Sequence, residues 1–309
     1  MTNSDTIGIV TVTYNSAAVI DDFLSSMLAQ TEVDFILYIV DNASTDGTVH
    51  RLAKCEDRRV VLIQNSANLG VAEGNNVGIK AALNMGCGRV LLINNDTLFD
   101  PGLLATLNQG MERHGCEIAV PKILFFDRPD TIWYGGGYFN SLRGCGNHYG
   151  LGKKDCAQYD SPRAVTYSPT CCMLIKRDVF IRVGLMDPIY FIYFDDTDFC
   201  LRAFRNGIKL LYLPSAQMLH KVSSLTGGVS EFTLRFITRN HVYYVLKHYP
   251  WWRAVSYAIA FYLYLPCKYL LYLRRPGLFA AAHKAFWEGI SLHFSNLGRP
   301  HRTELTRVP

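Results

Sequence analysis

The stretch RVLLINNDTLFDPG, which begins at Arg89, places polar residues directly after an apolar run. Four apolar residues lead into Asn94, Asn95 and Asp96. A buried strand that ends in amides and one carboxylate presents polar atoms at the edge of a sheet, where α/β proteins bind ligands. A single aspartate is a poor site for a divalent cation, because such ions take about six ligands. The stretch therefore predicts a ligand site in which Asp96 needs help from other groups.

A second acidic cluster, DDTDFCLR, begins at Asp195 and follows the aromatic run YFIYF. Its carboxylates, Asp195, Asp196 and Asp198, stand at the expected start of a helix, whose positive end favours negative charge. Capping of that helix can account for one or two of the three carboxylates, but three so close together are harder to explain in this way. Like charges and partial burial raise the pKa of a carboxyl group toward the range in which a general base works. We therefore expect a proton-accepting carboxylate in this cluster.

Two further polar residues follow apolar runs. Asp41 comes directly after FILYIV, where its carboxylate can accept a hydrogen bond from the imide N–H of a pyrimidine base or can cap the next helix. His220 follows the expected strand KLLYLPSAQ, and a lone histidine is more often structural than catalytic. If the loop folds back toward Asp96, His220 can add a nitrogen ligand to a Mn²⁺ or Mg²⁺ ion that Asp96 and a diphosphate hold.

The elements that must position these residues alternate between strands and helices over about the first 100 residues. Apolar and β-branched runs predict strands at residues 7–14, 35–40, 60–65 and 89–95, with helices between them. This alternation implies a parallel, three-layer α/β domain that binds ligands at the carboxyl ends of its strands. The cluster Thr13-Tyr14-Asn15 then lies at the same edge as Asp41 and Asp96.

Glycine marks the entry to the third helix, in NLGVAEGNNVG. The spacing of Gly70, Gly74 and Gly78 is GxxxGxxxG, which excludes the dinucleotide fingerprint GxGxxG, and the chain has no GxxxxGK[ST] phosphate loop. A glycine-rich helix entry can still let a diphosphate approach the backbone. Close packing of a helix on a sheet explains such glycines equally well.

The pattern is less regular in the middle of the chain. Residues 120–170 are rich in Gly and Tyr and predict a long functional loop. A strand and a helix return in CCMLIKRDVFIRVGLMD. Another helix is expected to start in the acidic cluster, and KLLYLP reads as a strand.

Basic charge is concentrated in the last part of the chain. Residues 1–240 hold 22 Lys and Arg against 24 Asp and Glu, whereas residues 241–309 hold nine against two, a net charge of +7. The tail therefore suits an anionic surface, and the core shows no nucleic-acid-binding character.

The tail is also apolar and aromatic around Trp251 and Trp252. Its longest uncharged run, Ala254–Cys267, has 14 residues, fewer than the roughly 18–20 that a spanning helix needs. The composition predicts helices that lie in a membrane interface, with their cations toward anionic headgroups. A helical cap packed on the α/β domain and a single tilted span are the alternatives.

The nine cysteines include no CxxC pair, and Cys171 and Cys172 are adjacent. That spacing suits neither a zinc ribbon nor a disulfide framework. With an odd count and no signal peptide in MTNSDTIGIV, we expect reduced thiols in the cytosol.

Taken in order, these segments resemble the family 2 glycosyltransferases with the GT-A fold, in particular the bacterial rhamnosyltransferase-like branch. The resemblance covers residues 7 to about 250. It rests on VTVTYNS, VDNASTDGT, NLGVAEGNNVG, LLINNDTLFDP, CCMLIKRDVFIRVGLMD, YFIYFDDTDFCLRA, HKVSSLTGG and FITRNHVYYVLKHYP.

The resemblance implies a division of the chain and a role for each site residue. Residues 1–230 would form the GT-A catalytic domain, with a nucleotide-sugar half up to about residue 100 and an acceptor half after it. Residues 231–309 would form an amphipathic helical region that associates with membranes. Asp196, paired with Asp195, matches the family's base, and Asp96 with His220 would hold the divalent cation. The expected donor-binding residues are Thr13, Tyr14, Asn15, Asp41, Asn68, Gly70, Asn75, Asn94, Asn95 and Asp96. Asn94 departs from the family's DxD motif, because many relatives carry aspartate there.

The activity implied is inverting transfer of a sugar from a nucleotide diphosphate to a lipid-linked, lipopolysaccharide or other cell-surface glycan at the cytoplasmic face of the inner membrane. The first choice of donor is dTDP-L-rhamnose, followed by UDP-galactofuranose or a UDP-hexose. A nucleotide-sugar-binding protein with little activity and a membrane-tethered scaffold are alternatives. A sugar nucleotidylyltransferase fits less well, because VTVTYNSAAVIDD lacks the glycine- and Arg/Lys-rich loop that those enzymes need.

Overall fold

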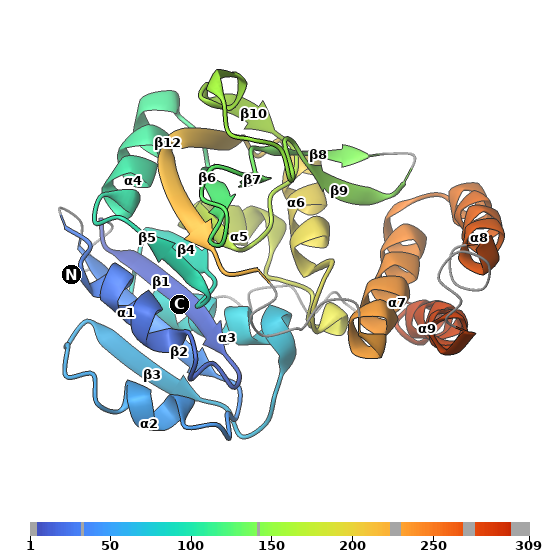
Figure 1. Cartoon of the computed structure of the whole chain (residues 1–309), viewed down its shortest axis with the longest axis horizontal. Helices are drawn as coiled ribbons and strands as arrows, with labels where there is room; N and C mark the ends of the chain where they lie inside the picture. Colours follow the sequence, from blue (N-terminus) through green and yellow to red (C-terminus); the bar gives the residue numbers. More distant parts are fainter. Residues whose placement is uncertain (1–4, 32–33, 141–142, 223–229, 268–275, 298–309) are drawn as a thin grey trace.

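A computed structural model describes the protein at residues 5–31, 34–140, 143–222, 230–267 and 276–297 (Figure 1). Its centre is a mixed sheet in the strand order β10-β12-β6-β11-β4-β1-β2-β3, with β5 paired to β12 and β7 paired to β6. The first four strands are β1 (Ile7–Thr13), β2 (Phe35–Asp41), β3 (Val60–Gln64) and β4 (Arg89–Ile93). They run parallel to one another, as their apolar runs predict.

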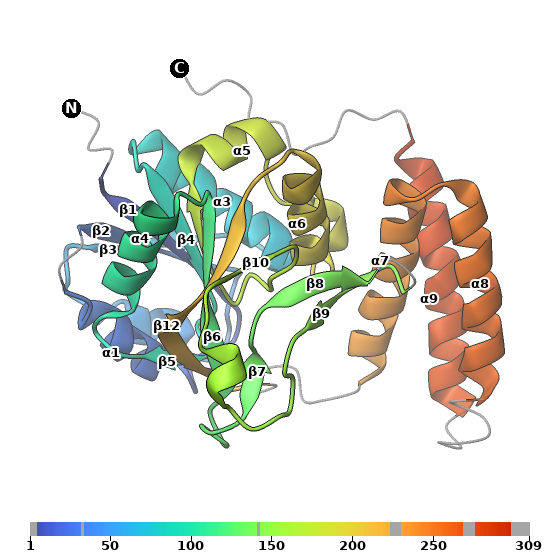
Figure 2. The ribbon, with the colours of Figure 1, turned by 90° about the horizontal axis from the view of Figure 1, so that it is seen from above.

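The predicted helices connect these strands. They are α1 (Ile20–Leu28), α2 (Thr48–Leu52) and α3 (Gly70–Asn84). In Figure 2, α1 and α3 lie on opposite sides of the strands, which gives the expected layers. A Cβ atom at Gly74 or Gly78 would collide with Val12 or Val10 of β1. These two glycines therefore let α3 pack closely on the sheet.

The expectation of a parallel sheet fails at β11 (Cys172–Lys176). This strand lies between β4 and β6 (Ile118–Phe125) and is antiparallel to both. The chain enters β11 at the carboxyl edge of β4, because Cys172 pairs with Ile93. The segment before β11 therefore lies beside Asn94, whose N–H donates to the Cys171 carbonyl at 3.0 Å.

The predicted long loop at residues 120–170 is instead a set of short strands. The set comprises β7 (Ile132–Tyr134), β8 (Gly137–Asn140), β9 (Cys145–His148) and β10 (Arg163–Val165), with a short 3₁₀ turn, η1 (Ala157–Tyr159). Lys122 of β6 is fully buried, and its Nζ lies 3.0 Å from Asp155 and 2.5 Å from Asp160. These ion pairs fasten the segment to the sheet, which a solvated loop would not need.

The remaining elements of the α/β part include β12, the strand that pairs with β5, β6 and β10. They are β5 (Thr97–Phe99), α4 (Leu103–His114), α5 (Arg177–Val183), the 3₁₀ turn η2 (Pro188–Tyr190), α6 (Asp195–Arg205) and β12 (Leu210–His220). Between η2 and α6, Phe191, Tyr193 and Phe194 adopt φ angles of +66°, +63° and +68°. Such angles cost residues with side chains roughly 1–3 kcal/mol each, so surrounding contacts have to hold them.

Three helices complete the described chain: α7 (Glu231–His248), α8 (Trp251–Pro266) and α9 (Pro276–Ser295). Figure 2 shows them side by side at the α6 end of the molecule, with α7 nearest to the sheet. Ser230 Oγ accepts a hydrogen bond from Thr233 N–H at 3.1 Å and so caps α7. In the part of the chain that the structure describes, no helix has both the length and the apolarity required to cross a membrane. The boundary predicted at residue 230 coincides with the start of α7, and the division into two domains stays a prediction.

Candidate active site

Asp96 and His220 meet at the carboxyl edge of the sheet. The chain turns after β4 into β5, which pairs with the end of β12 so that Thr97 lies opposite His220. His220 Nε2 lies 3.2 Å from Asp96 Oδ1, and both side chains are about nine-tenths buried. The predicted meeting is therefore present, but His220 stands on a strand and not in a loop. After a bulge, β12 resumes its pairing with β6 and continues through His220.

This pair fits two neighbouring ligands of one octahedral cation. Ligands at about 2.1 Å from such an ion lie roughly 3 Å apart when they are adjacent. Among the described residues there is no group of three or more His, Cys, Asp or Glu side chains that could hold a metal. His220 Nδ1 is buried and has no hydrogen-bond partner in the described chain, although metal-binding histidines usually donate from that second nitrogen. Two protein ligands and an unsupported ring make a weak site, which has to be completed by water or phosphate oxygens.

Asn95 has a structural role that the sequence does not reveal. Its Nδ2 donates to the Val12 carbonyl at 2.6 Å and to Ser16 Oγ at 3.2 Å. The amide thus ties the end of β4 to the end of β1. Asn94 is half-buried beside it, and its contact with a donor stays a prediction.

Asp41 anchors the turn that follows β2. Its Oδ1 accepts hydrogen bonds from Thr13 Oγ1 at 2.8 Å and Ser44 Oγ at 2.6 Å, and its Oδ2 accepts one from Ser44 N–H at 2.9 Å. The alternative that Asp41 caps the next helix is wrong, because Asp46 accepts the hydrogen bond from Thr48 N–H at the start of α2. A carboxylate offers about four acceptor positions, so Asp41 can still accept one more hydrogen bond.

Tyr14 and Asn15 lie beside this turn. Asn15 adopts a φ of +52°, and its Oδ1 accepts a hydrogen bond from Thr45 N–H at 2.8 Å. The Tyr14 side chain is 47% exposed at the sheet edge. An aromatic ring held at this edge is free to stack on a flat ligand group.

The entry to α3 is occupied by the protein itself. The N–H groups of Val71 and Ala72 donate to the Phe191 carbonyl at 2.6 and 3.3 Å. A Cβ atom at Gly70, where φ is +79°, would collide with that carbonyl. The expectation that a diphosphate meets these amides therefore gives way to packing as the reason for Gly70. Asn68 Oδ1 accepts from Gly70 N–H at 2.9 Å, and Asn75 is buried in α3.

Asp195 and Asp196 form the first turn of α6. Burial and the neighbouring charge of Asp196 raise the pKa of Asp195, whose Oδ2 has no hydrogen-bond partner in the described residues. Asp196 is only half-buried; its Oδ1 accepts from Thr197 N–H at 2.6 Å and its Oδ2 from Tyr167 OH at 3.1 Å. Burial raises the pKa of Asp196, although these hydrogen bonds act against the rise. Asp196 is thus the carboxylate that a ligand can reach.

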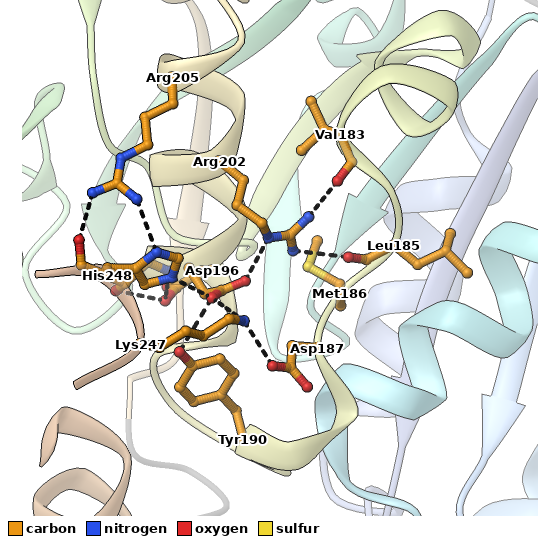
Figure 3. A network of polar contacts seen from close by, with 12 residues as sticks. Val183, Leu185, Met186, Asp187, Tyr190, Asp196, Arg202, Arg205, Lys247 and His248 are labelled. Carbon is orange, nitrogen blue, oxygen red and sulfur yellow. Dashed lines mark hydrogen bonds and ion pairs between the residues drawn. The ribbon is translucent and has the colours of Figure 1, made fainter. Parts of the chain in front are cut away.

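Asp198, the third acid of the cluster, belongs to a structural network. It is fully buried, with Oδ2 at 2.7 Å from Arg202 Nε and Oδ1 at 2.6 Å from both Lys247 Nζ and His248 Nε2. Figure 3 shows Arg202 of α6 close to Lys247 and His248 of α7 in this network. Burial alone would raise its pKa, but the charges of Arg202 and Lys247 hold the pKa of Asp198 well below its usual range.

An aromatic layer, missed by the sequence reasoning, joins the two acidic positions. The Tyr167 ring, whose hydroxyl contacts Asp196, stacks on His148 at 5.8 Å between centroids. Trp133 lies edge-on to His148 at 4.9 Å and to His220 at 4.5 Å. Burial lowers the pKa of His148, which favours the neutral ring. The aromatic run WYGGGYFNSLRGCGNHYG was the available signal, but nothing in it indicates which rings face the site.

Comparison with known proteins gives three kinds of match. A family model described as Glycosyl transferase family 2 matches residues 8–184. The chain is 27% identical over 271 residues to an N-acetylglucosaminyl-diphospho-decaprenol L-rhamnosyltransferase of Mycobacterium tuberculosis, which covers 81% of this chain and 88% of that protein. It is also 27% identical over 192 residues to the dTDP-rhamnosyl transferase RfbF of Shigella flexneri, covering 62% of this chain and 61% of that one.

The crystal structure of GalNAc-T7 with UDP, GalNAc and Mn²⁺ has the same GT-A fold. It matches with a TM-score of 0.61 at 17% identity, over 79% of this chain and 48% of that one. At this identity the likeness concerns the fold alone.

Proposed function

Because this chain belongs to glycosyl transferase family 2 and is a glycosyltransferase, we propose that it transfers a sugar with inversion, in one displacement, from a nucleotide diphosphate to an acceptor hydroxyl. The observation that carries this proposal is the aromatic layer Tyr167-His148-Trp133. It supports the proposal because its contacts run without a break from the carboxylate of Asp196 to His220, the partner of Asp96. A single displacement needs a base on the acceptor side, here Asp196, and a separate group on the side of the leaving diphosphate, here Asp96.

Asp196 accepts the proton of the attacking hydroxyl in this mechanism. Tyr167 donates a hydrogen bond to Oδ2 and so orients the carboxylate. Asp195 lies deeper, and its raised pKa favours the neutral form, which leaves the charge of the pair to Asp196.

Asp96 and His220 would hold Mn²⁺ or Mg²⁺ in this mechanism. When bound, the cation supplies positive charge that stabilises the departing nucleotide diphosphate. Since the described residues offer two ligands, the metal would bind tightly only when the donor's phosphate oxygens complete its shell.

The preferred donor is dTDP-L-rhamnose, with UDP-galactofuranose or a UDP-hexose as alternatives. Both relatives named above are rhamnosyltransferases by name, and one name includes dTDP. The residues that we assign to the donor at the carboxyl edge are Thr13, Tyr14, Asn15, Asp41, Asn68, Asn75 and Asn94. Asn95 and Gly70 support this edge through the contacts described above.

A thermal-shift screen tests the donor assignment. At equal concentrations with Mn²⁺, dTDP-L-rhamnose should raise the Tm more than UDP-galactofuranose or UDP-glucose does. A ligand at 100 times its Kd stabilises by about 2.7 kcal/mol. Mn²⁺ alone should produce little shift. A largest shift with a UDP-sugar would overturn the choice of rhamnose, and a large shift with Mn²⁺ alone would contradict the shared metal site.

The proposed acceptor is a lipid-linked or cell-surface glycan, reached by peripheral binding at the cytoplasmic face of an anionic membrane. On α8, Trp251, Val255, Ile259 and Leu263 recur every four residues and are 49–77% exposed, so they form one apolar stripe. An apolar groove of about 270 Å³ opens beside the stripe. Residues of all three helices line it, among them Val242, Leu246, Trp251, Ala258, Phe286 and Ile290.

The charge of this region supports a membrane lipid as the occupant. Nine Lys and Arg against two acids in residues 241–309 attract anionic headgroups, and the groove offers apolar walls to a hydrocarbon chain. The printed name of the Mycobacterium tuberculosis relative includes a diphospho-decaprenol acceptor, which supports a lipid-linked acceptor here. The proposal combines the two interpretations of the tail: α7 packs on the α/β part as a cap, and the exposed stripe of α8 would contact the membrane.

Vesicle binding tests the stripe. Replacing Trp251, Val255, Ile259 and Leu263 by serine should lower binding to phosphatidylglycerol vesicles by at least about tenfold, because each buried side chain contributes roughly 1.5–3 kcal/mol. Ile181→Ser, at a 65% exposed position on α5, is the matched control and should bind normally. Cosedimentation measures both. Equal binding by the fourfold variant would exclude the stripe from the membrane contact.

A further inference from the structure

The segment that leads into α6 is held in an unfavourable backbone conformation. Phe191, Tyr193 and Phe194 all have positive φ angles, which side chains disfavour. Phe194 is the residue directly before Asp195, and its carbonyl accepts from Asp198 N–H at 2.8 Å. The direction in which Asp196 points therefore depends on whatever fixes this segment.

Asn240 of α7 holds this segment. It is fully buried, and its Nδ2 lies 2.8, 2.7 and 2.9 Å from the carbonyl oxygens of Tyr190, Ile192 and Tyr193, which share its two N–H groups. One amide group thus bridges three carbonyls of the turn. A hydrophobic side chain at this position would remove this donor from all three carbonyls.

The residues beside Asn240 hold the same segment. Arg239 Nη2 donates to the carbonyls of Ile189 and Tyr190 at 3.0 and 2.9 Å. Rings of the same helix stack on the rings of the segment. Phe236 lies 5.2 Å from Phe191, and His241 lies 4.9 Å from Phe194.

Both ends of the segment are bound to α7 as well. Lys247 Nζ lies 2.8 Å from Asp187 Oδ2 before the segment and 2.6 Å from Asp198 Oδ1 after it (Figure 3). Helix α7 thus contacts the segment with positive φ angles and both of its flanks, from Asp187 to Asp198. It lies outside residues 8–184, where the family model matches.

We infer that Asn240 is a positioning residue for the transfer reaction: through the carbonyls of residues 190, 192 and 193 it fixes the turn that aims Asp196 at the acceptor hydroxyl. The inference rests on the proposed function, because it takes Asp196 as the base. It assigns a catalytic purpose to FITRNHVYYVLKHYP, which otherwise reads only as part of a helix packed on the domain.

The test compares Asn240→Ala with Leu234→Ala in the full chain. Leu234 is buried on the same helix but packs against Leu278 and Ala282 of α9, away from the turn. Both variants lose stability, which thermal unfolding measures. Only Asn240→Ala should lower kcat for release of dTDP from dTDP-L-rhamnose, with Mn²⁺ and with water as acceptor. The expected loss is about 10- to 100-fold, the effect of a misplaced catalytic group.

Further readouts separate positioning from general weakening. Asn240→Ala should shift the acid limb of the kcat–pH profile while the KM for dTDP-L-rhamnose stays near the wild-type value. Arg239→Lys keeps the charge but loses the planar fork, so it should also lower kcat, by a smaller factor than Asn240→Ala. It replaces Asn240→Ala as the test variant if Asn240→Ala does not fold. If both retain wild-type kcat and pH profile, the inference is overturned.

The outcome with Asp196→Asn is separate. If Asp196→Asn turns over normally, the base assignment fails whatever Asn240 does. If Asp196→Asn is inactive and Asn240→Ala is active, only the positioning role fails.

Discussion

Replacing Asp196 by asparagine should lower sugar transfer by about 10²- to 10⁴-fold, the contribution of a positioned general base. The amide has nearly the same shape; its oxygen can take the place of Oδ1 and accept from Thr197 N–H, and its NH₂ group can donate to the Tyr167 hydroxyl oxygen. The turn and the donor site should therefore persist. Release of dTDP from dTDP-L-rhamnose measures the loss, and thermal shift with the same donor measures binding.

The control for this change is Asp178→Asn, the same substitution at an exposed position in the first turn of α5. It should leave both turnover and donor binding unchanged. Wild-type turnover by Asp196→Asn would remove Asp196 from the base role. Loss of the donor-induced shift would instead indicate that the substitution damages the donor site.

The pH dependence of turnover follows from the same residue. A base works when it is deprotonated, and burial raises the pKa of Asp196. Turnover should therefore fall as the pH drops through this raised value, at a higher pH than the roughly 3.9 of an ordinary aspartate. Asp196→Asn should abolish this limb of the profile.

Replacing Asp198 by alanine should destabilise the fold by about 3–5 kcal/mol, the cost of removing one partner of a buried ion pair. Arg202 and Lys247 would remain buried with one carboxylate fewer between them. Urea unfolding followed by circular dichroism measures the change. The control is Asp21→Ala, which breaks an ion pair between Arg51 and a 59% exposed side chain and should cost no more than about 1 kcal/mol. Equal losses for both variants would contradict the structural role of Asp198.

Acid should weaken the same network. The pKa of Asp198 is lower in the folded chain than in the unfolded one, so its contribution is complete above the unfolded pKa of about 3.9 and is lost as the pH falls through the folded value. The difference in stability between wild type and Asp198→Ala should therefore shrink in acid.

The sequence allows reliable prediction where the signal is local. The strands β1 to β4 and the start of α6 are confirmed, because neighbouring residues alone determine their periodicity. The family resemblance and the α/β fold are confirmed by the matched family model and the shared GT-A fold.

Long-range contacts account for what the sequence does not reveal. The direction of β11 depends on where the chain re-enters the sheet, and no local pattern records that. Asp198 belongs to the same acidic cluster as Asp195 and Asp196, so the sequence does not distinguish it from them. Its structural role depends on partners such as His248, which lies 50 residues away. The sequence allows a diphosphate to approach the backbone at Gly70. In the fold, Phe191, which is far along the chain, occupies that space.

The network around Asp198 limits how far this protein can be treated as modular. A fragment that ends at residue 230 would lack Lys247 and His248 and leave the carboxylate of Asp198 in the interior with less compensation. Exchange of the terminal helices between homologous enzymes would then fail unless positions 187, 198, 240 and 247 were exchanged together. We therefore expect hybrids of two homologues joined at residue 230 to be unstable, although the local sequence there suggests a domain boundary.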